Sequence, residues 1–109
     1  MKISWFDRLY TGEKAEKKRF RIIRGIRRSK PQPGIYVITP ASNGNNILDI
    51  YPATVLLLPF YRDEDFLIMG IASGYQEALE VAGRIVDDMY RKTGGFDLPA
   101  FMGEEAGKV

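Results

Sequence analysis

The chain has 109 residues, of which 45% are hydrophobic, with 16 Lys or Arg, 14 Asp or Glu, a net charge of +2 and neither Cys nor His. This length supports one domain with one core, and the missing residue types exclude disulfides, thiol nucleophiles, the Ser-His-Asp triad and most transition-metal sites. No apolar run approaches the ~20 residues of a membrane span, and no secretory signal opens the chain, so we expect a cytoplasmic protein without integral membrane association.

The chain begins with a segment of helical spacing. Four apolar residues between positions 3 and 10 stand at i, i+1, i+4 and i+5, which predicts a short helix with one apolar stripe. Packing in the core is the expected role of this stripe, and contact with an anionic membrane surface is the alternative. The four residues are Trp5, Phe6, Leu9 and Tyr10.

Residues 14–30 carry nine Lys or Arg and one acid, so positive charge is concentrated in the N-terminal part of the chain. Residues 1–39 hold eleven bases and three acids, a net charge of +8, whereas residues 40–109 hold five bases and eleven acids, a net charge of −6. Spacing predicts an amphipathic helix over 13–29 with its isoleucines on the core side. Five cations form its opposite side, the basic face: Lys17, Lys18, Arg21, Arg24 and Arg28.

The basic face has two interpretations. It is either a solvated surface that lies free or near the acidic half of the same chain, or a surface that docks on nucleic acid or another polyanion by neutralising phosphates. Its cations are accompanied by neither Asn nor Gln, and the interleaved aromatic residue is Phe20. We therefore expect any binding to involve the phosphate backbone rather than the base sequence.

Two strands are predicted after this helix, on either side of a loop. Five β-forming residues between Gly34 and Pro40 predict a strand over 35–39. The Asn-Gly turn signal in 41–46 predicts a loop, and the alternation of apolar and polar residues in 47–51 predicts a short strand.

A buried strand and a second long helix follow. Residues 52–61 favour a short helix over an extended segment, because a Pro stands at the position of a first helical turn. Residues 66–72 are continuously apolar, which predicts a strand buried on both faces in the middle of a sheet. Residues 74–93 combine an apolar stripe with i,i+4 charge pairs, and Ser73 with Gln76 has the pattern of a capping box.

The turn before this helix is a candidate anion site. Residues 70–74 join a buried strand to a helix N-terminus, where free backbone N–H groups bind anions. Ser73 and Gly74 are the candidate residues, and a tight turn with a self-satisfied cap is the alternative. The turn matches neither the phosphate loop nor the dinucleotide fingerprint. The carboxylates of the helix alternate with bases, so we expect no metal site, no cofactor and no catalytic residue.

These elements predict an α/β (α+β) fold, a single small domain in which two or three strands are covered by two long amphipathic helices. A helical segment between the strands suggests a βαβ-like unit. The domain is expected to cover residues 1–103, with Phe96, Leu98, Phe101 and Met102 packed back on the core. Residues 104–109 are expected to form a disordered C-terminal tail.

Three stretches resemble a group of small bacterial proteins of unknown function. They are KPQPGIYVIT at 30–39, NILDIYPA at 46–53 and GIASGYQEALEVAGRIVDDMYRKTGGFD at 70–97. The resemblance covers most of the chain. It implies a bacterial, cytoplasmic, stand-alone domain and provides no activity or site residue for this sequence.

Three functions stay open at this point. The first is a non-enzymatic interaction or adaptor module that self-associates, because the usual catalytic residue types are missing and the apolar residues after 95 can complete the core of a second copy in a homodimer. The second is a nucleic-acid-associated accessory protein that binds phosphates through the basic helix 14–30. The third is a small ligand- or anion-binding domain, or a small enzyme, at the turn 70–74.

Overall fold

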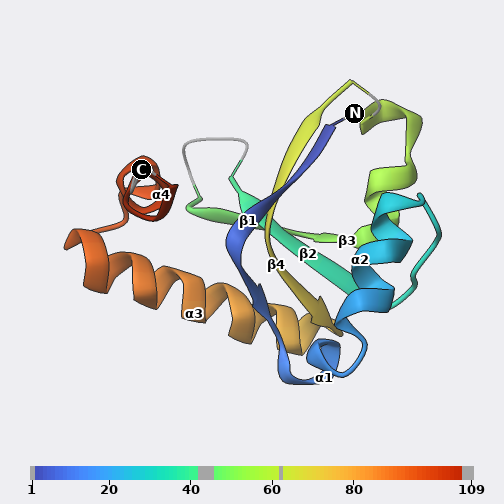
Figure 1. Cartoon of the computed structure of the whole chain (residues 1–109), viewed down its shortest axis with the longest axis horizontal. Coiled ribbons are helices and arrows are strands. Elements are labelled where there is room, and N and C mark those ends of the chain that lie inside the picture. Colours follow the sequence, from blue (N-terminus) through green and yellow to red (C-terminus); the bar gives the residue numbers. More distant parts are fainter. Residues whose placement is uncertain (1, 42–45, 62, 107–109) are drawn as a thin grey trace.

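A four-stranded sheet forms the centre of the molecule (Figure 1). The computed structural model describes residues 2–41, 46–61 and 63–106. The sheet has strand order β1-β4-β2-β3, in which β1 runs parallel to β4 and β2 runs antiparallel to both of its neighbours. Its strands are β1 (Lys2–Thr11), β2 (Ile35–Pro40), β3 (Leu48–Pro52) and β4 (Asp65–Ser73).

Helices cover both faces of this sheet and divide the core into two apolar clusters (Figure 1). On one face, Ile22 and Ile26 pack against Val37 and Ile68. This face carries α1 (Glu13–Glu16), α2 (Arg19–Arg27) and the 3-10 turns η1 (Ala53–Leu57) and η2 (Pro59–Tyr61). The other face carries α3 (Tyr75–Thr93) and α4 (Leu98–Ala106), which bury Val81, Ile85 and Phe101.

The sequence patterns predicted the fold class and most of the elements. The protein is a small α+β domain, as expected. The strands predicted over 35–39, 47–51 and 66–72 correspond to β2, β3 and β4. Strand β4 lies in the interior of the sheet and is buried on both faces, as its continuous apolar run indicated.

The helix predicted over residues 3–10 is wrong, because this segment is strand β1. Trp5 and Leu9 pack on the α2 side of the sheet, and Phe6 and Tyr10 pack on the α3 side. A spacing of four residues returns a side chain to the same side in a strand as well as in a helix, so the pattern fits both. Strand β1 adds a fourth strand to the two or three expected.

The predicted βαβ-like unit is also wrong, because β2 and β4 pair directly and antiparallel. The parallel pair is β1 with β4, whose register is Lys2 opposite Asp65 at one end and Thr11 opposite Ile71 at the other. Nothing in the local pattern of residues 3–10 reveals this partner, because pairing across more than half of the chain depends on tertiary packing.

The helix predicted over 13–29 is interrupted at Lys17 and Lys18, which separate α1 from α2. The break lets α1 dock near the N-terminus of α3, while the nine-residue α2 packs its isoleucines on the sheet. Of the two long helices expected, α3 with 19 residues is the long one. The segment 52–61 forms two 3-10 turns instead of one short helix.

The C-terminal segment returns to the core. Phe101 of α4 is fully buried and stacks on Phe6 of β1, with ring centroids 5.8 Å apart. Met102 is half-buried against the same cluster, whereas Phe96 is exposed. Of the predicted tail, 104–106 belong to α4, and 107–109 lie outside the described residues, as do 42–45 of the predicted loop.

Candidate functional site

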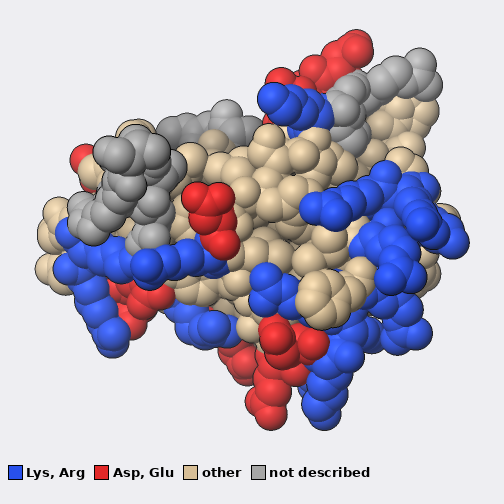
Figure 2. Space-filling model, in the orientation of Figure 1, with Lys and Arg blue, Asp and Glu red and all other residues tan. Residues whose placement is uncertain are grey.

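The basic face lies on α2, on the break that precedes it and on Arg28, the C-cap residue of α2. The side chains of Lys17, Arg21, Arg24 and Arg28 are exposed, and Lys18 is half-buried. Figure 2 shows Lys and Arg side chains gathered at the end of the molecule where α2 lies. The acidic half of the chain therefore leaves four of the five predicted cations open to solvent.

The cations of the basic face have no carboxylate partner among the described residues. Of the run 14–30, Arg19 is the residue that forms an ion pair within the described part of the chain, at 3.9 Å from Glu16. The other described ion pair joins Arg91 to Asp87 on α3. The charges of the basic face are thus available without breaking an internal salt bridge.

Helix α2 is fixed in place by its buried side and by its C-terminal end. Ile22 and Ile26 are buried against the sheet. The Gln32 side-chain amide donates a hydrogen bond to the carbonyl of Ile22 at 3.1 Å and lies over Gly25, where a Cβ would stand 2.6 Å from Gln32 Nε2. The Lys30 N–H donates to the Gly25 carbonyl at 2.9 Å. Helix α2, which carries Arg21 and Arg24, is therefore held firmly against the sheet.

The structure adds Arg27 and Trp5 to this surface, neither of which the sequence assigned to the basic face. Arg27 is exposed, and its guanidinium lies 5.8 Å from the ring centroid of Trp5 on β1. The spacing of residues 3–10 predicted a helix at Trp5, whereas its approach to Arg27 depends on the position of β1 in the sheet. Phe20, noted as the interleaved aromatic residue, is 79% exposed.

The second predicted site, the turn 70–74, is occupied by the chain itself. The Ser73 N–H donates a hydrogen bond to Glu77 Oε1 at 2.8 Å, and the Gly74 N–H donates to the carbonyl of Gly34 at 2.7 Å. An anion bound through these two donors would have to displace the Glu77 carboxylate and the Gly34 carbonyl.

The predicted capping box of Ser73 and Gln76 is wrong. The N-cap residue of α3 is Gly74, at φ 93°, so Ser73 lies outside the helix and does not cap it. A backbone with φ in this range favours Gly, which shifts the helix start by one residue. The side chain that reaches back from the first turn is Glu77 in place of Gln76.

Glu77 links three segments of the chain. Besides Ser73, its carboxylate accepts hydrogen bonds from the N–H of Lys14 at 2.7 Å and of Ala15 at 3.1 Å, in the first turn of α1. The side chain is 7% exposed. Gly12 permits this approach, because a Cβ at that position would overlap the Glu77 carboxylate.

The pKa of Glu77 reflects these contacts. Burial by itself raises the pKa of a carboxyl group, because it disfavours the charged form. The backbone N–H groups of Ser73, Lys14 and Ala15, together with the positive charge of Lys14, outweigh that effect, and the pKa of Glu77 lies below its ordinary value. Glu77 is therefore ionised at neutral pH and serves as the internal anion of this region.

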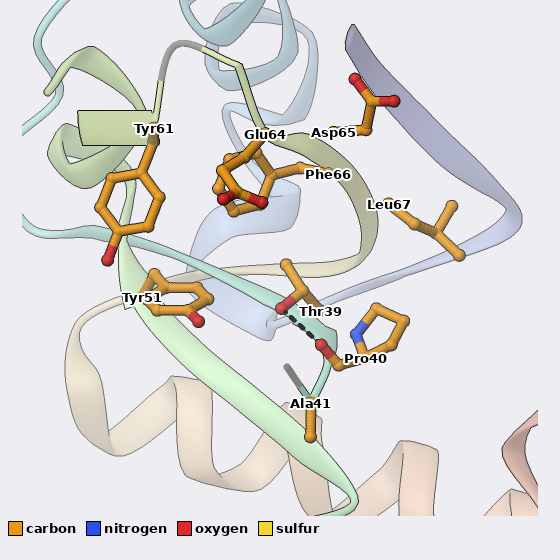
Figure 3. A pocket seen from close by; sticks show the side chains of 9 residues that line it. All are labelled: Thr39, Pro40, Ala41, Tyr51, Tyr61, Glu64, Asp65, Phe66 and Leu67. Carbon is orange, nitrogen blue, oxygen red and sulfur yellow. Dashed lines mark hydrogen bonds between the residues drawn. The ribbon is translucent and has the colours of Figure 1, made fainter. Parts of the chain in front are cut away.

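A hollow of about 580 Å³ lies where β2 ends and β4 begins (Figure 3). Tyr51 of β3, Tyr61 of η2 and Phe66 of β4 form an aromatic wall, with ring centroids 5.8 to 6.3 Å apart. Glu64 and Asp65 lie at its rim, and both are exposed.

Several polar groups of this hollow are engaged within the chain. The Tyr51 hydroxyl donates to Asp49 Oδ2 at 3.0 Å, and the Thr39 hydroxyl donates to the next carbonyl at 3.1 Å. Asp65 accepts a hydrogen bond from the Lys2 N–H at 3.1 Å, and Figure 3 shows its carboxylate directed away from the tyrosine rings. Because a ligand site needs convergent polar groups, we assign no ligand to this hollow.

Residues 2–41, 46–61 and 63–106 contain no cluster of three or more acidic side chains that could hold a metal ion. None of the helices in this part of the chain has the length and apolar character needed to cross a bilayer. Comparisons with protein-family models, curated proteins and solved structures found no match to this chain.

Proposed function

We propose that the protein is an interaction module that binds polyanions through the basic face, with the phosphate backbone of nucleic acid as the ligand. The observation that carries the proposal is the exposure of Lys17, Arg21, Arg24 and Arg28 without a carboxylate partner among the described residues. Each contact with a phosphate releases a condensed counterion, which favours binding at low salt. Helix α2 and the residues at its two ends present these charges together, so several phosphates can be neutralised by one surface.

The double variant Arg21→Glu with Arg24→Glu is expected to abolish binding of a DNA duplex at ~50 mM salt, where electrostatic binding is strong. Both side chains are exposed, so the fold should remain intact. For four neutralised phosphates, the affinity of the unmutated protein should fall about 100-fold between ~50 and ~200 mM salt. Fluorescence anisotropy of a labelled duplex measures both effects, and thermal unfolding checks the fold.

The matched control is Arg91→Glu with Lys92→Glu, which makes the same change in net charge on the exposed side of α3. This control should retain most of the affinity. Absence of binding by the unmutated protein at ~50 mM salt would reject the proposal. An equal loss in the control would show that net charge, and not the basic face, is responsible.

Self-association is a second candidate, and a specific feature of α3 supports it. Tyr75, Leu79 and Tyr90 are 54%, 44% and 55% exposed. Together with the half-buried Ala82 and Val86 they lie within about 80° of one another around the helix, beside the buried stripe. A contiguous exposed apolar stripe is typical of a contact surface. The C-terminal residues offer less to a second copy than α3 does, because Phe101 fills the core of its own chain.

Substitution of Leu79 by Lys is expected to shift the protein to monomers at concentrations where the unmutated chain forms dimers, because the charge would have to be desolvated in the contact. Light scattering at low and high concentration measures the effect. The matched control is Leu58→Lys, an exposed leucine next to η1 on the opposite side of the sheet. A strictly monomeric unmutated protein at high concentration would contradict this candidate function.

A further inference from the structure

We infer that the basic face selects single-stranded over double-stranded nucleic acid, with an unpaired base stacked on Phe20 and the adjoining phosphates held by its neighbouring arginines. This inference rests on the polyanion binding proposed above and names the class of ligand that the same surface takes.

Phe20 stands out on α2 because its ring is in solvent while the isoleucines of the helix are committed to the core. It is 79% exposed, more than any other large hydrophobic residue in the described part of the chain. At 3.6 residues per turn, Arg24 lies one turn further along the helix within about 40° of Phe20, and Arg27 lies two turns along within about 20°. The ring is therefore placed among cations instead of against an apolar neighbour.

A second aromatic residue continues this surface. Arg27 lies 5.8 Å from the ring centroid of Trp5, which is half-buried on β1. The order Phe20, Arg24, Arg27, Trp5 places two cations between two aromatic rings, one on α2 and one on β1. Surfaces that bind single strands combine positive charge along the backbone with aromatic rings on which bases stack. The two rings distinguish the face from a plain cluster of lysines and arginines.

A duplex cannot use the exposed ring in the same way. Its bases are paired and stacked on one another, so a phenyl ring on a helix surface meets only the sugar–phosphate edge. An unpaired base has a free face and gains a stacking contact without loss of pairing. The cations can contact the phosphates of both ligands, whereas Phe20 can stack only on a base of the single strand. Because α2 carries neither Asn nor Gln, we expect little preference among bases.

The test compares three probes with the same set of proteins: an oligothymidylate of about 15 nucleotides, a duplex of the same length, and heparin, which has charge but no bases. The unmutated protein should bind the single strand at least tenfold more tightly than the duplex. Phe20→Ala should weaken the single-strand complex about tenfold, the effect of one lost stacking contact. The same variant should change duplex and heparin binding less than twofold.

Three further variants separate stacking from other roles of the ring. Phe20→Tyr should retain the affinity for the single strand, and Phe20→Leu should weaken it about tenfold as Phe20→Ala does, because only the aromatic residues stack. Phe96→Ala removes another exposed phenyl ring, which packs on Tyr90 at 5.6 Å away from α2, and should behave as the unmutated protein. Trp5 is the single tryptophan, so its fluorescence should be quenched by the oligothymidylate and not by heparin.

The outcomes distinguish this inference from the proposed function. Equal affinity for single strand and duplex, or an unchanged affinity in Phe20→Ala or Phe20→Leu, would overturn the inference and leave polyanion binding in place. Loss of all three probes to the same extent in Phe20→Ala would also overturn it. Absence of binding to every probe would reject the inference together with the proposed function.

Discussion

Replacement of Glu77 by Ala is expected to lower the free energy of unfolding by about 4 kcal/mol, because each hydrogen bond to a charged group contributes roughly 1.5–3 kcal/mol. The carboxylate accepts hydrogen bonds from the N–H groups of Ser73, Lys14 and Ala15. Its removal leaves these donors without their acceptor and water recovers only part of the loss. For a small domain this is a large fraction of the total stability. Denaturant unfolding measures the difference.

The control is Glu80→Ala, one turn along α3, where the side chain is exposed; its effect should stay within about 0.5 kcal/mol. A similar effect of both substitutions would mean that Glu77 acts only as a surface residue of the helix.

The same contact predicts a dependence of stability on pH. Because the pKa of Glu77 is lower in the folded protein than its ordinary value of 4.5, the contribution is complete above that pH and is lost as the pH falls through the folded-state value. In Glu77→Gln this part of the acid sensitivity should be absent. The measurement is the difference in unfolding free energy between the two proteins at neutral pH and below pH 4.5.

Substitution of Phe101 by Ala is expected to cost about 4 kcal/mol, the usual effect of removing a buried phenyl ring and leaving a cavity. Phe101 is fully buried, stacks on Phe6 and carries the contact of α4 with the sheet. Phe101→Leu should cost less, since it retains most of the volume. Thermal or denaturant unfolding gives the values.

Phe96→Ala is the matched control, because this ring is exposed on the segment between α3 and α4. It should change the stability by no more than about 0.5 kcal/mol. A small effect of Phe101→Ala would indicate that α4 is not part of the cooperative unit.

The fold was predictable where a local pattern has one structural solution. The continuous apolar run of β4 and the amphipathic α3 have compositions that few alternatives satisfy. The segment at Trp5 and Phe6 was not predictable, because its spacing suits a strand and a helix equally. Pairing with β4 makes this segment a strand, and residues 3–10 by themselves contain no information about that partner.

The candidate sites, like the elements of the fold, were predictable only where they depend on a local pattern. The exposure of Arg21 and Arg24 followed from helical periodicity, since the isoleucines had to face the core. The contact of Trp5 with Arg27 and the hydrogen bonds of Glu77 to α1 involve residues that are far apart in the sequence. Patterns of residue spacing within one element cannot predict such pairs. At Ser73 a local rule failed for a local reason: it predicted a cap that the positive φ of the neighbouring Gly74 excluded.

The parallel pairing of β1 with β4 has a consequence for the order of folding. Strand β1 pairs with Asp65–Ser73, which follows β2 and β3 in the sequence and is therefore synthesised after both of them. Contacts of such long sequence separation are slow to form, because a large loop must close before they stabilise anything. Strands β2 and β3, close in sequence and antiparallel, are suited to form first. Strand β1 has β4 as its one neighbour in the sheet, so it can join the sheet only after residues 65–73 have been made.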